Sequence, residues 1–168
     1  MRPECEHGRA AWPVFLRSCV ILMDRLDRQL QSTVGLQLSW YEVLFQLNSA
    51  PGGRMPMRQL ADSVMLSKSG VTRLVDRMAE AGLIERLACS DDGRVCYAVL
   101  TTPGRTLLQR AQPVAFQGVE DHFARHITEQ EAQVIAGALM RVLAAAGHSQ
   151  PAPPRQTPEE LVRENRNV

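Results

Sequence analysis

The chain has 168 residues, of which 45% are hydrophobic and 22% are charged, and its formal net charge is +1. A chain of this length buries roughly 70% of the surface that its unfolded form exposes, so it can build a hydrophobic core without disulfides. No apolar run approaches the roughly 18 residues of a membrane-spanning helix, which predicts a cytoplasmic protein with no membrane partner. The four cysteines lack the close spacing of a zinc site, so we expect free thiols, no metal and no cofactor.

The N-terminal third of the chain predicts an arm and a long helix. Residues 1–11 show no periodic pattern, which predicts a flexible arm. From residue 12 to about residue 33, apolar residues such as Phe15, Cys19 and Met23 recur at spacings of three and four. This pattern is typical of an amphipathic helix.

A second helix is predicted after residue 37. Ser39 and Glu42 stand at the spacing of a capping box, in which each side chain binds a backbone amide of the other residue. Pro51-Gly52-Gly53 closes this helix. Met55-Pro56-Met57 is short and contains a proline, which is consistent only with a short edge strand.

The segment from Arg58 to Leu100 carries the pattern of a winged helix-turn-helix. A short helix and a turn precede a longer helix, for which Ser67 is the expected N-cap and Gly82 the expected stop. Two strands, residues 83–87 and 95–100, then flank an Asp-Gly pair, which is a strong hairpin signal. In this motif the beginning of the longer helix enters the major groove of DNA, and here it carries short polar and basic side chains. The pattern therefore predicts sequence-specific binding to double-stranded DNA.

Two more helices are predicted after the wing. Thr102-Pro103 reads as a cap followed by a proline at the first helical position. Thr128 and Glu131 form another capping box ahead of a final helix that is nearly devoid of charge along one side. Something must cover that apolar side, and we expect the first helix and the last two to pair with the same helices of a second copy.

The predicted fold class is mainly α with a small β wing. A single domain of residues 12–148 holds a winged helix-turn-helix, at about residues 37–101, between dimerisation helices at about 12–33 and 102–148. Residues 149–168 contain four prolines followed by charged residues. That composition predicts a disordered tail.

Several motifs stand in a consistent order along the chain: Leu38–Leu44, Leu66–Arg77, Ala81–Ile84, Asp92–Arg94 and Leu100-Thr101. Together they resemble the multiple-antibiotic-resistance regulator (MarR) family over about residues 12–147. The resemblance implies a homodimeric repressor or activator that binds a pseudopalindromic operator and releases DNA when a small-molecule effector or an oxidant acts.

The resemblance assigns DNA contact to residues of the longer helix and of the wing: Ser67, Lys68, Ser69, Thr72, Arg73, Arg77, Asp92 and Arg94. Hydroxyl and basic side chains on the helix can reach phosphates or base edges. Arg94 can enter a narrow minor groove, with Asp92 holding its guanidinium in position. The alternative is a surface helix whose charged residues are merely solvated.

The trigger for DNA release has separate candidates. Trp12, Arg17, Trp40, Tyr41 and Phe116 are candidates for an effector pocket like that of ligand-responsive relatives. The alternative is that the aromatic residues are ordinary core and that Arg17 is solvated.

Two cysteines are candidates for a redox switch. Cys89 and Cys96 are equidistant from the centre of Asp92-Gly93, so an even-length hairpin loop would place them opposite each other, with Cβ atoms about 4.5–5.5 Å apart. A disulfide needs Cβ atoms about 3.8 Å apart. Two small strand residues without a bond are therefore the alternative.

Two other classes of function compete with DNA binding. One is a protein-interaction or dimerisation module that uses the winged fold without binding DNA. The other is an enzyme, but no nucleophile–base pair or carboxylate dyad stands at a telling spacing. We therefore expect no catalytic residue.

Overall fold

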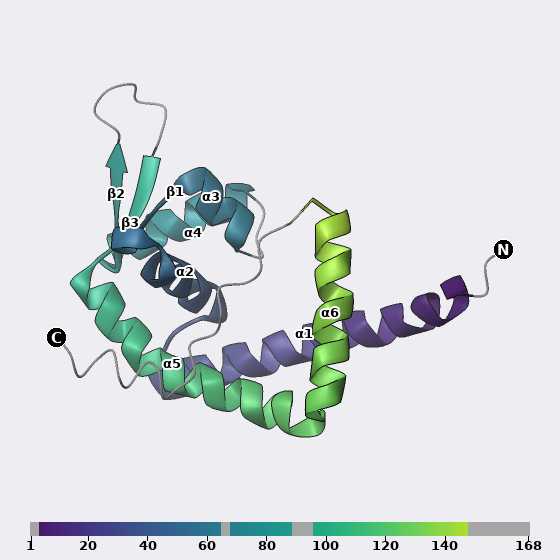
Figure 1. The fold of residues 1–168 in the computed structure, drawn as a ribbon. Coiled ribbons are helices and arrows are strands. Elements are labelled where there is room, and N and C mark those ends of the chain that lie inside the picture. Colours follow the sequence, from purple (N-terminus) through teal and green to yellow (C-terminus); the bar gives the residue numbers. More distant parts are fainter. Residues whose placement is uncertain (1–3, 65–67, 89–95, 148–168) are drawn as a thin grey trace. The chain divides into compact units, whose positions relative to one another are not determined.

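The computed structural model describes residues 4–64, 68–88 and 96–147. They form two compact units, the first ending at Ala115 and the second beginning at Phe116. The elements, in chain order, are α1 (Glu4–Val34), α2 (Leu38–Ser49), the 3-10 turn η1 (Pro51–Gly53), β1 (Arg54–Pro56), α3 (Met57–Ser63), α4 (Lys68–Glu80), β2 (Ile84–Ala88), β3 (Cys96–Leu100), α5 (Thr102–His122), η2 (Ala124–His126) and α6 (Glu129–Ala145) (Figure 1). The predicted fold class, mainly helical with a small antiparallel sheet, is confirmed.

Helix α1 is longer than its apolar pattern predicts. It begins at Glu4 and therefore takes in most of the segment expected to be an arm, with Pro13 inside it. It ends at Val34, where Gly35 adopts a positive φ of 70° that favours glycine. Near this end Leu30 is fully buried, so the C-terminal part of α1 belongs to the core of the first unit.

The start of α2 corrects one prediction. The helix begins at Leu38. Its N-cap residue is Gln37, whose side chain makes no capping hydrogen bond. Ser39 therefore lies inside the helix and is not the cap of the predicted box. Instead, Oδ1 of Asp27 on α1 accepts a hydrogen bond of 2.8 Å from the backbone N–H of Leu38. A carboxylate at a helix N-terminus accepts a hydrogen bond from an otherwise unpaired amide and interacts favourably with the helix dipole. The contact from α1 therefore fixes where α2 begins.

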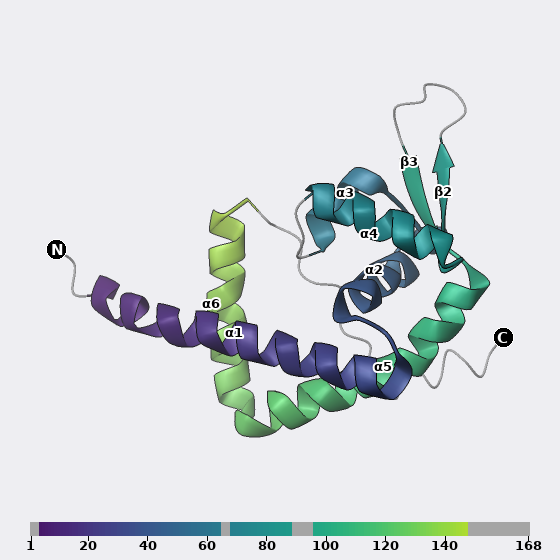
Figure 2. The ribbon, with the colours of Figure 1, turned by 180° about the vertical axis from the view of Figure 1, so that it is seen from behind.

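The sheet is antiparallel and has the strand order β1-β3-β2. β2 and β3 lie side by side in both ribbon views (Figures 1 and 2). Successive strand residues point to opposite faces, and Met55, Ile84, Ala98 and Leu100 are buried on the inner face. The predicted edge strand at Pro56 and the predicted hairpin strands are confirmed to within one residue at each end.

The core of the first unit joins the sheet to α2, α3 and α4. Its largest fully buried side chains come from these helices, from β2, from α1 and α5, and from the turn between α1 and α2: Leu30, Leu36, Val43, Leu44, Leu47, Leu60, Val71, Leu74, Val75, Met78, Ile84 and Leu108. Because these side chains leave water together, the winged motif has a rigid base on which polar side chains can be positioned.

The first turn of α5 lies tightly against the start of the hairpin. The cap is Thr101 and not the predicted Thr102: its Oγ1 accepts a 3.1 Å hydrogen bond from the N–H of Gly104 and donates a 2.8 Å bond to the carbonyl of Gly82. A Cβ built on Gly104 would lie only 2.1 Å from the backbone oxygen of Leu83. Only glycine fits there without a shift of the backbone.

In the second unit, the predicted capping box at the start of α6 is confirmed. Oγ1 of Thr128 accepts a hydrogen bond from the N–H of Glu131, and Oε2 of Glu131 accepts a 2.8 Å bond from the N–H of Thr128. The hydrogen bonds from the Thr128 backbone and side chain lower the pKa of the Glu131 carboxyl. The negative charge is thereby held at the helix N-terminus, where the dipole favours it.

Candidate nucleic-acid interface

Helix α4 has one buried side and one exposed side. Val71, Leu74, Val75 and Met78 are between 0% and 2% exposed. The intervening positions hold the three predicted DNA contacts Thr72, Arg73 and Arg77, all of which are exposed. The apolar side anchors the helix and fixes its rotation about its own axis. The polar and basic side is thereby presented to solvent.

The first turn of α4 holds the remaining predicted contacts of this helix. Lys68 and Ser69 are its first two residues, whereas Ser67, the predicted N-cap, lies outside the described residues. The roles assigned to the side chains of Ser67, Lys68 and Ser69 therefore stay predictions. Helix α3 contacts α4 and lies beside it in both views (Figures 1 and 2).

The wing is built on the β2–β3 hairpin. Its register pairs Ile84 with Leu100 at the base and Ala88 with Cys96 at the other end. Asp92 and Arg94, the predicted wing contacts, lie outside the described residues.

The hairpin register corrects the predicted cysteine pairing. Cys96 lies opposite Ala88 and not opposite Cys89, because the segment between the strands, residues 89–95, has an odd length. Cys89 itself lies outside the described residues, and Cys96 is a half-buried free thiol. The geometric argument for a cross-strand disulfide is therefore lost.

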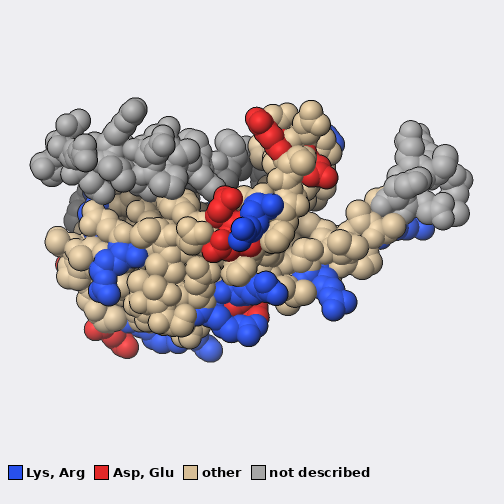
Figure 3. Space-filling view, turned by 90° about the horizontal axis from the view of Figure 1, so that it is seen from below, with Lys and Arg blue, Asp and Glu red and all other residues tan. Residues whose placement is uncertain are grey.

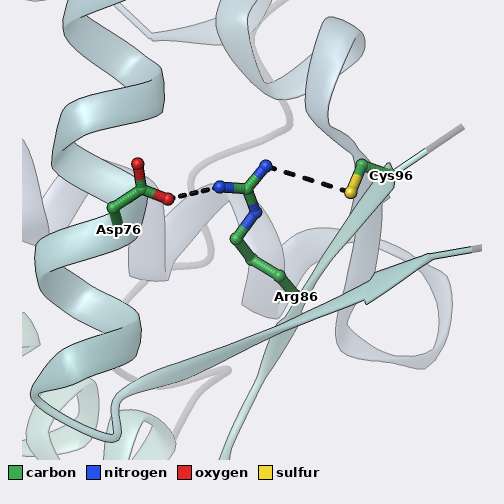
Figure 4. A network of polar contacts seen from close by, with 3 residues as sticks. All are labelled: Asp76, Arg86 and Cys96. Atoms are coloured by element: carbon green, nitrogen blue, oxygen red, sulfur yellow. Dashed lines mark hydrogen bonds and ion pairs between the residues drawn. The ribbon is translucent and has the colours of Figure 1, made fainter.

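A network of polar contacts joins α4 to the hairpin (Figure 4). Nη1 of Arg86, on β2, donates a hydrogen bond to Oδ1 of Asp76 on α4 and forms an ion pair with it. Nη2 of the same guanidinium lies 3.9 Å from Sγ of Cys96 on β3, within the range of a weak hydrogen bond to sulfur. The hydrogen bond to Cys96 contributes most to raising the pKa of Arg86 above its ordinary value, and the hydrogen bond to Asp76 contributes next.

Sequence reasoning missed this network. Arg86 and Asp76 are ten residues apart and lie on different elements, so no helical or strand period relates them. The available signal was the position of Asp76 on the longer helix, where a lone carboxylate near DNA phosphates would be unfavourable unless a cation neutralised it.

The five candidate effector residues fall into different environments. On α1, Trp12 is 59% exposed, its ring centroid lies 6.1 Å from that of Phe15, and Arg17 is exposed. On α2, the half-buried Trp40 and Tyr41 pack against the hydrophobic core. Phe116 is half-buried and belongs to the second unit. Their role in effector binding stays a prediction.

Among the described residues of the first unit, two buried side-chain polar atoms have no hydrogen-bond partner. They are Nε1 of Trp40, which is a donor, and Oε1 of Gln29, which is an acceptor. An unsatisfied buried polar atom costs about 1–3 kcal/mol. Each of these two atoms carries that cost separately unless a polar group reaches it.

Within the described residues, no group of three or more His, Cys, Asp and Glu side chains is arranged to hold a metal ion. Across the same part of the chain, no helix is long and apolar enough to cross a membrane.

The arrangement of α3, α4 and the following hairpin defines a winged helix-turn-helix protein. The model of the MarR family matches residues 34–95. AbsC, a MarR family transcriptional regulator from Streptomyces coelicolor, is 30% identical to this chain, with a TM-score of 0.76 over 84% of this chain and 95% of AbsC. On these grounds the chain belongs to the MarR family of transcriptional regulators.

Two further proteins are similar. Sco3205, a MarR family transcriptional regulator from Streptomyces coelicolor whose crystal structure is in complex with DNA, is 28% identical, with a TM-score of 0.76 over 88% of this chain and 90% of Sco3205. The HTH-type transcriptional regulator MhqR from Bacillus subtilis is 29% identical over 90 residues, which is 54% of this chain and 61% of MhqR. The match to MhqR thus spans less than two thirds of its length.

Proposed function

We propose that this chain is a sequence-specific DNA-binding repressor that acts as a homodimer on a pseudopalindromic operator. The observation that carries the proposal is the two-sided character of α4, whose buried side locks the helix while Thr72, Arg73 and Arg77 face solvent. A helix fits the major groove, where hydroxyl and guanidinium groups discriminate between base edges. The crystal structure of the similar Sco3205 in complex with DNA supports the proposal.

Helix α1 carries one exposed apolar surface that supports a dimer. Trp12, Val14, Leu16 and Val20 are between 47% and 67% exposed on this helix. In Figure 3 the part of α1 that extends to the right, up to the grey residues, is mostly tan on the face in view, with basic side chains along its lower side. Water-exposed apolar side chains gathered on one helix mark an interaction surface.

The second helix of the proposed interface is α6. Val134, Ile135, Met140, Val142 and Leu143 are between 36% and 71% exposed, and none of the residues of α6 is buried. Burying one such side chain fully contributes about 1.5–3 kcal/mol. We infer that a second copy covers these surfaces. Because a dimer with twofold symmetry presents two α4 helices, its operator has two related half-sites about one helical turn apart.

We also propose that a small-molecule effector controls DNA binding. The buried Nε1 of Trp40, a donor without a partner, supports an effector that accepts a hydrogen bond, such as a phenolic acid. The test is the unfolding temperature with phenolic acids, lipophilic drugs, zinc or peroxide added, because a ligand of the folded state raises it. A phenolic effector predicts an increase that Trp40→Phe reduces, and an unchanged temperature with every compound contradicts the proposal.

The experiment that tests DNA binding is a titration of the duplex upstream of the protein's own gene, with random duplex as competitor. Arg73→Ala is expected to relax base preference, because a lost base contact removes about 1–3 kcal/mol of discrimination. Arg94→Ala is expected to weaken binding and to reduce the salt dependence by about one phosphate contact. Arg110→Ala, at an exposed arginine of α5, is the matched control and should change neither. Binding that does not distinguish the upstream duplex from random DNA would contradict the proposal and favour an interaction module.

A further inference from the structure

The inner face of the hairpin changes character along its length. At the base, Ile84 and its partner Leu100 are 1% and 8% exposed and belong to the core. Two pairs further out, and therefore on the same face, Arg86 lies opposite the buried Ala98. Apolar packing therefore fixes the hairpin at its base, and the next inward side chain of β2 is a charged one.

That charged side chain connects the hairpin to the proposed DNA-reading helix. The guanidinium of Arg86 binds the carboxylate of Asp76 on α4 through one nitrogen and approaches Sγ of Cys96 on β3 through another (Figure 4). One planar group that projects from β2 thus contacts two other elements, α4 and β3. On the opposite face of the sheet, Arg54 lies over the ring of Tyr97, 5.9 Å from its centroid, and this contact connects β1 with β3.

We propose that Arg86 is a positioning residue that holds the β2–β3 hairpin against α4, so that wing and recognition helix meet DNA as one unit. The proposal rests on the proposed function, because it assigns Arg86 a role in presenting that site. It also separates Arg86 from the arginines expected to touch DNA, since the charge of Arg86 is already neutralised by Asp76. Asp76 in turn has its negative charge compensated on the helix that must approach phosphates.

The size of the effect follows from the exposure of the pair. The side chains of Arg86 and Asp76 are 37% and 46% exposed, so solvent screens their attraction. Exposed pairs of this kind change an equilibrium by roughly two- to fivefold. The structural role therefore predicts a local loosening of the hairpin and not unfolding of the protein.

The first test uses the full-length protein without DNA. Hydrogen exchange of the backbone amides in β2 and β3 is measured in the wild type, in Arg86→Met and in Asp76→Asn. Both variants should exchange about two- to fivefold faster in the hairpin and at unchanged rates in α2, because each removes the same contact from one side. The double variant should match the single ones, since the contact can be lost only once. The control, Arg110→Met on α5, should leave the hairpin unchanged.

The second test measures operator affinity at several salt concentrations. Arg86→Met should weaken binding about two- to fivefold with an unchanged salt dependence, and Arg86→Lys should recover part of the loss. A salt dependence reduced by about one phosphate contact would make Arg86 a direct DNA ligand and overturn the proposal. Hairpin exchange equal to that of the wild type in both single variants would also overturn it. If the wild type fails to bind the operator, the proposed function is wrong, while the exchange experiment still decides whether Arg86 holds the hairpin.

Discussion

Replacing Gly104 with alanine tests the packing between α5 and the base of the wing. The new Cβ would lie 2.1 Å from the backbone oxygen of Leu83 and 3.0 Å from Cδ1 of Leu100. Ordinary contacts are about 3.5 Å or longer, so the helix would have to move by about 1.4 Å. That movement would break the hydrogen bonds by which Thr101 caps α5 and binds Gly82.

The expected loss of stability can be worked out from these contacts. Overpacking costs about 1–3 kcal/mol, and loss of the Thr101 cap adds about 1 kcal/mol. The better helix propensity of alanine offsets about 1 kcal/mol. The net expectation for Gly104→Ala is a loss of about 1–3 kcal/mol in the free energy of unfolding, which corresponds to a decrease in Tm of roughly 3–10 °C.

The matched control is Gly137→Ala on α6. There the nearest atom to a new Cβ is Nη1 of Arg141, at 3.6 Å, which is an ordinary contact with the end of a flexible side chain. The control is expected to stabilise the protein by up to about 1 kcal/mol. Urea unfolding followed by circular dichroism, at one fixed protein concentration, measures both variants. A midpoint for Gly104→Ala equal to or above that of the wild type would refute the reasoning.

Three further substitutions test the account elsewhere. The folded-state pKa of Glu131 is lowered, so the stability that Glu131→Gln removes should be constant above the ordinary pKa and should disappear as the pH falls through the lowered value. Urea midpoints of both proteins from pH 7 to pH 3 measure this difference, and a pH-independent difference would contradict the prediction. Asp27→Ala should lower the free energy of unfolding by about 0.5–2 kcal/mol in urea, because the N–H of Leu38 loses its cap. Asp24→Ala, at an exposed position, is the control and should cost less. Equal losses would contradict the capping role of Asp27. Val142→Asp should shift sedimentation towards the monomer, and an unchanged dimer would remove α6 from the interface.

The sequence predicted the features that depend on neighbouring residues. The helical period of Val71, Leu74, Val75 and Met78 located the buried side of α4, and a three-residue spacing located the Thr128 capping box. In both cases the interacting groups are close along the chain, so a local period or spacing determines the contact.

Features that depend on the tertiary fold were not predictable in the same way. The cap that Asp27 provides for α2 joins groups eleven residues apart on separate helices, so the nearer Ser39 was chosen wrongly. The residue that lies opposite Cys96 depends on whether the hairpin loop has an even or an odd length, because a change of one residue in the loop shifts the pairing of every residue in the two strands. The contact of Arg86 with Asp76 exists only because α4 and β2 pack together.

The central claim is that two copies of the chain present their α4 helices to one duplex. The most direct measurement is sedimentation of the protein with the duplex upstream of its own gene, with random duplex as competitor. We predict a complex of two chains per duplex that survives the competitor and that Arg73→Ala weakens. A chain that sediments as a monomer, or a complex that random DNA displaces as readily as the upstream duplex, would contradict the account.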